Sequence, residues 1–424
     1  MMRILLSAYA CEPGRGSEPG VGWGWVTELA NMGHRLCVVT RSDNRVAVER
    51  DPLAHAENVA FLYYDLPPSL LRCRNLPLGK RLYYVLWQWG AIRHLRETFP
   101  TLPFDAVHHV TYVSLRYPSF MGSLGVPFCF GPVSGGETVP WRLRTSFPLL
   151  AQAGELLRDV SNCLVRLDPF LRMTFHSASK IFLTPDSLSL VPKRWRYKCE
   201  TMLGIGLADE HRVHRTSPRH EKSLHALYVG RLLDWKGVAI ALRAVKQLRP
   251  HLDVRFTIVG DGPAKGRLLR LAKRLELGNA VEWRGWLPHP AVESSYADAD
   301  IFLFPSLRDS GAIAVLEAMA HGLAVVCTDL GGPGKIVTRD CGVVLPTTDK
   351  TTEQLVCDMA HALLQLARNP AARSRLAEGA QRRVQDFRFR NLVESIYPPA
   401  SAAFHDKQLD RQQPSEPCHD RMYA

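Results

Sequence analysis

The amino-acid sequence predicts an α/β protein with two Rossmann-like, doubly wound domains that face each other across a cleft. Three observations predict this fold. The chain has 424 residues, a length typical of two or three domains. Apolar runs of strand length alternate with segments of helical periodicity, which is typical of parallel sheets. The alternation is interrupted by a polar stretch over residues 204–223, which we interpret as an interdomain linker.

Composition excludes several classes of protein. The hydrophobic fraction of 46% and the charged fraction of 22% are ordinary for a folded protein, and they exclude collagen, coiled coil and wholesale disorder. The ten cysteines are scattered without any CxxC pair, so a disulfide framework and zinc-finger spacing are excluded. We find neither a secretory leader nor a membrane span, and we expect a cytoplasmic protein with reduced thiols.

The formal net charge of +12 is spread along the chain rather than gathered in a tail. This distribution disfavours a basic tail that binds nucleic acid. Residues 66–100 interleave six basic residues and one acid with leucine, tyrosine and tryptophan. Two interpretations stay open for residues 70–96. They form either a basic helical face in solvent or a peripheral contact with an anionic membrane, on the inner face of the cell membrane.

The first half of the chain is predicted to begin with a βαβ unit. The apolar run Arg3–Ala10 predicts a buried strand, and a glycine-rich loop follows over Gly14–Gly22. Trp23–Met32 has helical spacing, and Gly33 ends the helix. Further strands are predicted over residues 35–40, 106–110, 128–130 and 180–184.

The alternation restarts after the linker. Strands are predicted over residues 224–229, 254–259, 280–283, 301–305 and 324–328. Helices are predicted over residues 238–248, 265–277 and 312–320, and helical segments from about 351 to 387. The domains are therefore expected to be residues 1–203 and 204–383. The polar residues 401–424 are expected to be a disordered tail.

Loops that follow predicted strands are candidate ligand sites, because open α/β sheets bind ligands at the carboxyl ends of their strands. The loop over residues 12–20 is suited to expose backbone N–H groups to an anion beside a helix N-terminus. Its Gly16 and Gly20 are four residues apart, so the dinucleotide fingerprint is absent. A tight turn without a ligand is the alternative.

A second loop, over Gly230–Gly237, carries two cations five residues apart. Arg231 and Lys236 are suited to grip a diphosphate from two sides. The alternative is a pair of solvated charges, which is common for these residue types.

A third segment places two carboxylates, Asp309 and Glu317, eight residues apart around a predicted helix start. Eight helical residues rise about 12 Å, which suits a ligand with hydroxyls at both ends. Asp309 is alternatively a helix cap. A cap does not explain Glu317 within an apolar helix. The fourth segment, Gly331–Gly334, indicates a loop with positive φ or a close approach to a ligand.

The sequence contains neither HExxH nor GxSxG, and we expect no metal site and no serine hydrolase. His211 and His214 lie in the polar linker and are interpreted as solvated. His108 and His109 follow a predicted strand, and one of the two is expected to face the cleft.

These segments resemble a known family. Gly230 to Pro346 is similar to the nucleotide-sugar-binding domain of the group 1, family-4 retaining glycosyltransferases, which have the GT-B fold. The matching segments, in order, are GRLLDWKG, TIVGDGP, EWRGWL, ADADIFLFPS and DSGAIAVLEAMAHGLAVV. The segments EPGRGSEPGVGWGW, HHVTYVSLRYPS and GPVSGGETVP resemble members that act on cell-surface polysaccharides.

The resemblance implies a role for each matching residue. Arg231 and Lys236 would neutralise the donor diphosphate, Glu317 would hold the ribose hydroxyls, and Asp309 would contact the donor sugar. The distal phosphate would meet backbone groups of Gly311, Ala312 and Ile313, with Gly16 approaching from the N-terminal domain.

The chain departs from the family pattern at three positions. Asp309 replaces the first Glu of Glu-x7-Glu, and Ala312 replaces a glycine. Gly131 stands where many members have a histidine, so Glu137 or His109 is the expected substitute.

The resemblance implies a retaining transferase that moves a sugar from a nucleotide-diphosphate sugar to a glycan or lipid-linked acceptor in cell-surface polysaccharide biosynthesis. It implies no metal cofactor, and a last helix over residues 384–400 that crosses back to the N-terminal domain. Three alternatives stay open: a GT-B relative with epimerase or phosphorylase chemistry, a polyanion-binding module, and a degenerate transferase that serves as a scaffold.

Overall fold

The computed structural model describes residues 1–71, 79–208 and 223–398. The expected tail over 401–424 and most of the predicted linker, with His211 and His214, lie outside the described residues. Part of the basic stretch, residues 72–78, also lies outside them.

The first sheet has seven strands in the order β3-β2-β1-β4-β5-β6-β7. Its strands are β1 Arg3–Ser7, β2 Arg35–Thr40, β3 Val59–Tyr63, β4 Ala106–His109, β5 Phe128–Val133, β6 Lys180–Leu183 and β7 Cys199–Thr201. β1 pairs in parallel with both β2 and β4, so the strand order reverses direction at β1. That reversal is the mark of a doubly wound sheet.

The second sheet repeats this order with six strands, β10-β9-β8-β11-β12-β13. Its strands are β8 Ser223–Val229, β9 Asp253–Val259, β10 Val281–Gly285, β11 Ile301–Phe304, β12 Ala324–Thr328 and β13 Gly342–Leu345. All of its pairings are parallel. The inner strands β11 and β12 are buried at every residue, which explains their near-continuous apolar sequences.

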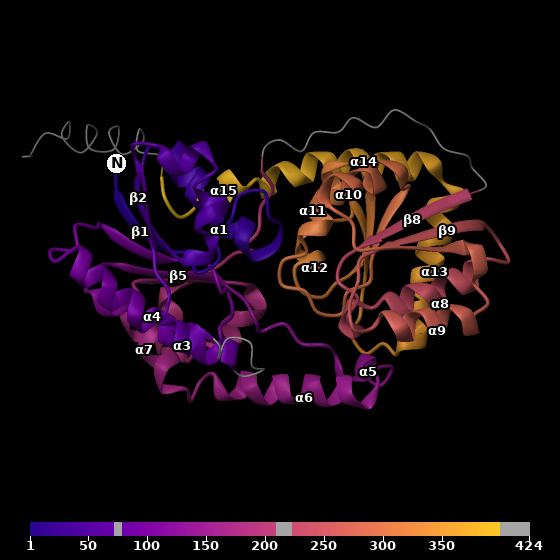
Figure 1. The fold of residues 1–424 in the computed structure, drawn as a ribbon. Helices are drawn as coiled ribbons and strands as arrows, with labels where there is room; N and C mark the ends of the chain where they lie inside the picture. The colour runs from indigo at the N-terminus through magenta and orange to yellow at the C-terminus, as the bar shows by residue number, and fades with distance from the viewer. Residues whose placement is uncertain (72–78, 209–222, 399–424) are drawn as a thin grey trace, which may run out of the picture. The chain divides into compact units, whose positions relative to one another are not determined.

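Helices connect the strands in both halves (Figure 1). The first half contains α1 Ser17–Asn31, α2 Arg45–Val48, α3 Pro68–Leu71, α4 Gly79–Thr98, α5 Trp141–Arg144, α6 Leu149–Leu164 and α7 Pro169–Ser177. The second half contains α8 Val238–Leu248, α9 Lys265–Arg274, α10 His289–Asp298, α11 Ile313–Ala320, α12 Pro333–Ile336, α13 Thr352–Arg368, α14 Pro370–Arg383 and α15 Phe389–Glu394. α10, α11 and α14 cover one face of the second sheet, and α8, α9 and α13 the other (Figure 1). Two Rossmann-like α/β domains are therefore confirmed.

The helical segments predicted from about 351 to 387 include α13 and α14, which are divided at Asn369; this residue caps α14 and is followed by Pro370. α1 begins at Ser17 rather than Trp23, so Gly20 and Gly22 lie inside the helix and not in the predicted loop. A Cβ on Gly22 would stand 2.1 Å from the carbonyl oxygen of Ala10. The glycine therefore allows the helix to lie against the end of β1.

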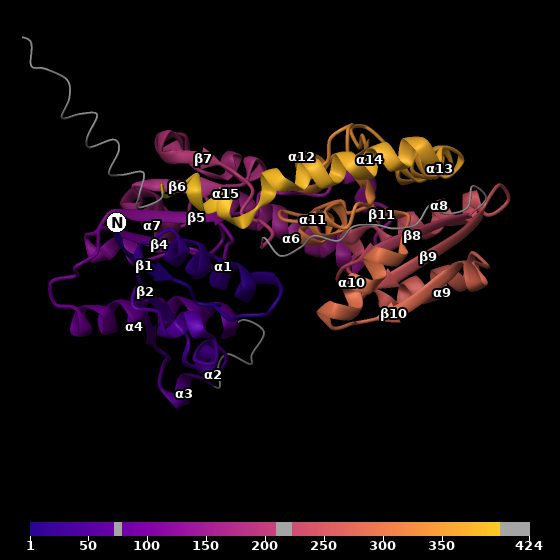
Figure 2. The same ribbon diagram turned by 90° about the horizontal axis from the view of Figure 1, so that it is seen from above.

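Two compact units are distinguished by the density of their contacts. Of the described residues, one comprises 1–71, 79–112, 120–129 and 393–398, and the other 113–119, 130–208 and 223–392. Within the first unit the ring centre of Tyr397 lies 5.6 Å from that of His108. Figure 2 shows α14 leading into α15, shortly before Tyr397. The domain limits at 203 and 383, and the crossing back of residues 384–400, stay predictions.

Candidate functional site

Three loops meet at the carboxyl ends of β8, β11 and β12, and glycines allow their close contact. Gly237 has φ +70°, and a Cβ there would stand 1.9 Å from the carbonyl oxygen of Pro305. Gly331 has φ +64°, and a Cβ there would stand 2.1 Å from the carbonyl oxygen of Asp309. The positive φ predicted for the Gly331–Gly334 segment is therefore confirmed at Gly331. A side chain there would collide with the backbone of Asp309.

Lys236 and Asp309 meet where these loops join. The Lys236 ammonium forms an ion pair with Asp309 Oδ2, and both side chains are more than four-fifths buried. Asp309 Oδ1 also accepts hydrogen bonds from the backbone N–H groups of Gly311 and Ala312, at 3.4 and 3.3 Å. The loop is thus held by a carboxylate that simultaneously fixes the cation.

The helix after this loop begins later than predicted. Ala312 has φ +57° and ψ +49°, the left-handed conformation, and α11 starts at Ile313. The expected rise over eight helical residues between Asp309 and Glu317 was therefore wrong, because four residues of the segment precede the helix. The start of α11 at Ile313 follows directly on the Asp309 turn, and a helix N-terminus favours a phosphate.

Arg231 lies on the same loop as Lys236 but is exposed. Its carbonyl oxygen accepts a hydrogen bond from the Tyr228 hydroxyl at 3.2 Å. Within the described residues, its guanidinium forms no ion pair. The side chain is therefore available to a ligand from solvent, whereas Lys236 is already engaged.

Glu317, which is half-buried on α11, has a partner that the sequence reasoning missed. Its Oε2 accepts a hydrogen bond from the Tyr296 hydroxyl at 2.8 Å. Tyr296 is buried on α10, and its ring stacks on His321 with centroids 5.1 Å apart. Burial, followed by the charge of Glu317, raises the pKa of Tyr296 well above its ordinary value. The phenol therefore stays a donor that orients the carboxylate.

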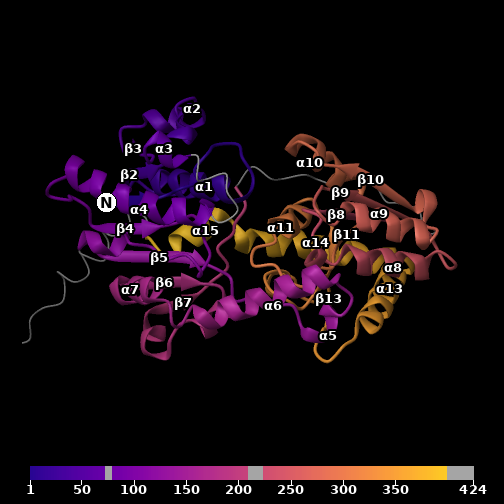
Figure 3. The same cartoon turned by 60° about the horizontal axis from the view of Figure 1, so that its bottom comes forward.

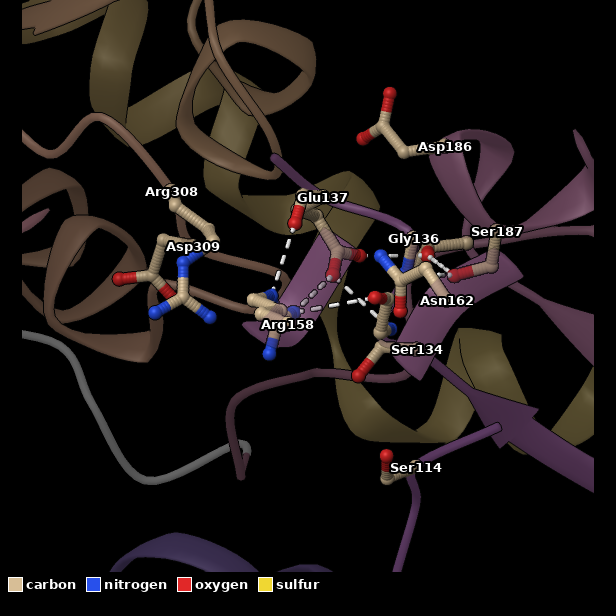
Figure 4. A network of polar contacts seen from close by, with 12 residues as sticks. Ser114, Ser134, Gly136, Glu137, Arg158, Asn162, Asp186, Ser187, Arg308 and Asp309 are labelled. Carbon is tan, nitrogen blue, oxygen red and sulfur yellow. Dashed lines mark hydrogen bonds and ion pairs between the residues drawn. The ribbon is translucent and has the colours of Figure 1, made fainter. Parts of the chain in front are cut away.

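Glu137 belongs to a buried polar network in the second unit (Figure 4). Its Oε1 accepts from the Thr184 hydroxyl at 2.7 Å, and its Oε2 accepts from Gly135 N at 3.0 Å. Arg158 Nη2 lies 3.9 Å from the same Oε2. Burial, followed by the charges of neighbouring arginines, lowers the pKa of Arg158 to about 10. Glu137 is therefore held by protein groups on both oxygens.

The network reaches the Asp309 loop through Arg308. Arg308 Nη2 donates to Glu155 Oε1 at 2.9 Å, and its guanidinium lies 4.2 Å from the centre of the Trp235 ring. Both charged side chains of the pair are nearly nine-tenths buried or more. Glu155 and Arg158 lie on α6, a segment for which the sequence analysis offered no role. Only the tertiary structure reveals their role, because their partners are distant in sequence.

His109 and Gly16 belong to the other compact unit. His109 is 1% exposed, and its Nε2 lies 3.2 Å from the Tyr84 hydroxyl. Burial, followed by the charge of His108, lowers the pKa of His109 to about 3, so the ring is neutral near pH 7. Gly16 precedes α1 in an extended conformation, and a Cβ there would meet nothing within 4 Å. The catalytic and binding roles of both residues stay predictions.

The described residues contain neither a cluster of metal ligands nor a membrane-spanning helix. Over residues 1–71, 79–208 and 223–398, no three His, Cys, Asp or Glu side chains gather as a metal site would require. In the same ranges, no helix has the length and apolarity needed to cross a bilayer.

Residues 209–383 match the family model of the group 1 glycosyl transferases. A protein of Escherichia coli K12 named as a colanic acid biosynthesis glycosyltransferase, WcaL, is 35% identical over 147 residues. That match covers 32% of this chain and 36% of WcaL, so the chain spans about a third of this relative's length.

Solved structures resemble the whole chain. Sucrose-phosphate synthase from Thermosynechococcus elongatus aligns over 97% of this chain and 100% of its own, with a TM-score of 0.63 and 17% identity. HepE from Anabaena, in complex with UDP, aligns over 95% and 100%, with a TM-score of 0.58 and 17% identity. At this identity the likeness establishes the fold. Residues 209–383 thus resemble the group 1 glycosyl transferases, and the chain has the GT-B fold of two Rossmann-like domains.

Proposed function

We propose that the protein is a retaining glycosyltransferase. It moves a sugar from a nucleotide-diphosphate sugar to a glycan or lipid-linked acceptor in cell-surface polysaccharide biosynthesis. The observation that carries the proposal is the ion pair between Lys236 and Asp309 at the carboxyl ends of β8 and β11. It joins the cation that suits a diphosphate to the carboxylate that suits sugar hydroxyls.

The proposed mechanism follows from the positions of these groups. As the bond between the sugar and the diphosphate breaks, negative charge grows on the leaving oxygen. Lys236 and Arg231 stabilise that charge, and the start of α11 binds the distal phosphate. The departing diphosphate accepts the proton of the acceptor hydroxyl, which attacks from the same face. Catalysis then rests on positioning and electrostatic stabilisation, and no metal is required.

Glu317 holds the ribose hydroxyls of the donor, and Asp309 contacts its sugar. Two comparisons support the choice of ligands. HepE is described in complex with UDP, and WcaL is named for colanic acid biosynthesis. Glu137 and His109 remain the candidates on the N-terminal side. Because both Glu137 oxygens have protein partners, we place Glu137 as a residue that positions the site rather than one that reacts.

The test is consumption of nucleotide sugar with and without acceptor, after a thermal-shift screen of nucleotide sugars has identified the donor. We expect consumption to require the acceptor, the product to keep the donor's anomeric configuration, and activity to survive EDTA. Conversion of the donor without acceptor would favour an epimerase, and dependence on inorganic phosphate a phosphorylase. An inverted product would contradict the retaining mechanism.

A further inference from the structure

Helix α6 exposes its apolar side and buries its polar side, which is the reverse of an ordinary surface helix. Its apolar side chains are exposed: Leu149 by 82%, Leu150 by 89% and Leu157 by 70%. Leu156, Val160 and Leu164 of the same helix are also about half exposed or more. At 3.6 residues per turn these six positions fall within about 120° of the helix circumference. They form one continuous apolar surface, which we name the leucine face.

The opposite side of α6 is polar and buried. Glu155 accepts from Arg308, and Arg158 Nη2 donates to the carbonyl oxygen of Gly135 at 3.1 Å. Asn162 Oδ1 accepts from Arg116 Nη2 at 2.6 Å. Figure 4 shows Arg158 and Asn162 directed toward the Glu137 network.

These contacts hold the leucine face outward. Turning it inward would leave the charges of Glu155 and Arg308 without their partners, at a large energetic cost. The exposure of the leucine face is therefore a fixed property of the unit, and an apolar surface of this extent marks an interaction site.

Exposed apolar side chains also occur in the segments directly before and after α6. Leu167 is 68% exposed, Phe170 at the start of α7 is 51% exposed, and Trp141 of α5 is 67% exposed. Figure 3, which brings this side of the molecule forward, shows α6 running between α5 and α7. The leucine face thus has aromatic residues near both of its ends, as membrane-interface helices commonly do.

The segment of the chain that carries the leucine face is basic. Residues 141–198 contain ten Lys and Arg against four Asp and Glu. All four acids are engaged within the protein: Glu155 and Asp159 with arginines, Asp186 with Lys335, and Asp168 as the cap of α7. In contrast, Arg166, Arg172 and Arg194 are exposed and pair with no carboxylate in the part of the chain that the structure describes. The rim is therefore complementary to a negative surface.

A groove of about 460 Å³ lies at the α7 end of this surface. Its lining is Pro169, Arg172, Met173, His176, Arg194 and Trp195. The Arg194 guanidinium lies 3.7 Å from the centre of the Trp195 ring, which holds it beside an apolar wall. Two arginines over an apolar floor suit a phosphate whose attached chains are hydrocarbon.

We propose that the leucine face of α6, with the α7 groove, is the surface by which this protein rests on an anionic phospholipid membrane. The leucines enter the boundary between headgroups and acyl chains, and Arg172 and Arg194 bind lipid phosphates. The inference does not depend on glycosyl transfer, because it rests on surface residues and vesicle binding alone.

This assignment differs from the membrane contact expected over residues 70–96. Within α4, Tyr83, Tyr84 and Trp87 are at most 1% exposed, so most aromatic residues of that stretch pack into the core. Leu82 and Trp89 are exposed there, at 57% and 47%. In the described part of that stretch the exposed large apolar side chains are Leu70, Leu82 and Trp89, against six on α6, and the leucine face of α6 is the better candidate.

The experiment is co-sedimentation of the full chain with vesicles of phosphatidylcholine, alone or mixed with phosphatidylglycerol. We expect binding to the anionic vesicles that weakens with salt. The double variant Leu150→Gln/Leu157→Gln should lose at least about tenfold in partition. The double variant Arg172→Gln/Arg194→Gln should lose about fivefold per charge on anionic vesicles only. Both changes are on exposed side chains, so thermal unfolding should be unchanged.

Leu269→Gln on α9, where the side chain is 41% exposed, is the matched control and should bind like the wild type. Wild-type protein that stays in the supernatant at low salt overturns the proposal. So does a loss of binding in Leu82→Gln with none in the α6 variant, since that places the contact on α4. Sedimentation velocity without vesicles tests whether a second copy of the chain binds the leucine face instead. A wild-type dimer that the α6 variant converts to monomer would assign the face to a second copy of the chain and overturn the membrane proposal.

Discussion

Lys236 and Asp309 form an ion pair although they are 73 residues apart and follow different strands. The pair joins the two loops that the proposed reaction needs, one for the diphosphate and one for the sugar. Because the two charges are mostly buried, removing either leaves the other without its partner. The pair thus couples the positions of the two loops to the positive charge that Lys236 offers to a donor diphosphate.

The first prediction is that Lys236 and Asp309 act as a unit. Lys236→Ala should lower kcat by about 10² to 10³, the loss typical of removing a group that stabilises transition-state charge. Asp309→Ala should also lower kcat, and the double variant should be little worse than the more damaged single variant. Steady-state kinetics of the four proteins checks this. Losses that multiply, in variants that unfold like the wild type, would show that the residues act independently.

The second prediction concerns Tyr296 as a positioning residue for Glu317. Tyr296→Phe removes one hydrogen bond to a carboxylate, worth about 1.5 to 3 kcal/mol, and keeps the stacked ring. We expect the Kd of the nucleoside diphosphate to rise by about tenfold or more when the nucleotide has its ribose hydroxyls, and to change little when it lacks them. Calorimetry with ribo- and dideoxyribonucleotides measures this difference. Tyr197→Phe, at a side chain 80% exposed, is the control. Equal loss for both nucleotides would contradict the assigned role.

The third prediction is that Ala312→Gly stabilises the protein. Ala312 has φ +57°, and an L-residue with a Cβ is disfavoured in this conformation by about 1 to 2 kcal/mol. The larger entropy of glycine in the unfolded chain offsets part of that gain, leaving about 0.5 to 1 kcal/mol. Denaturant unfolding measures the change. Ala314→Gly, inside α11, should instead destabilise by about 1 kcal/mol. A destabilised Ala312→Gly variant would show that the Cβ contributes more by packing than it costs in strain.

The fourth prediction concerns pH. Because the pKa of buried His109 falls to about 3, well below its ordinary value of 6.5, the unfolded chain binds a proton that the folded protein does not between those values. The free energy of unfolding therefore falls as pH decreases through this window. His109→Gln should make unfolding less dependent on pH between 7 and 5. An unchanged slope in His109→Gln would mean that His109 is protonated in the folded state.

Much of the fold followed from local pattern. Strands buried at every residue, such as β11 and β12, have near-continuous apolar sequences that predict them directly. The unpredicted strands are short or lie near sheet edges: β3, β7 and β13. Their partial exposure weakens the apolar signal. The helix start at Ile313 was misplaced because nothing in the residue type of Ala312 signals a left-handed conformation.

The residues of the candidate site divide in the same way. Lys236, Asp309 and Glu317 were identified by residue type and by their positions after strands, and the first two are brought together in the structure. Tyr296 was missed because its partner Glu317 is 21 residues away on another helix. Arg158 and Glu155 were missed for a related reason, since their partners lie in loops far along the chain.

By itself, the sequence determined the α/β class, the two-domain plan and the loops that carry charge, because these depend on periodicity and on residue order. Tertiary structure alone decided which distant groups pair and which way each helix faces. The leucine face of α6 is the clearest case. A periodic pattern shows that a helix has an apolar and a polar side, but only the buried partners Arg308 and Gly135 direct the polar side inward.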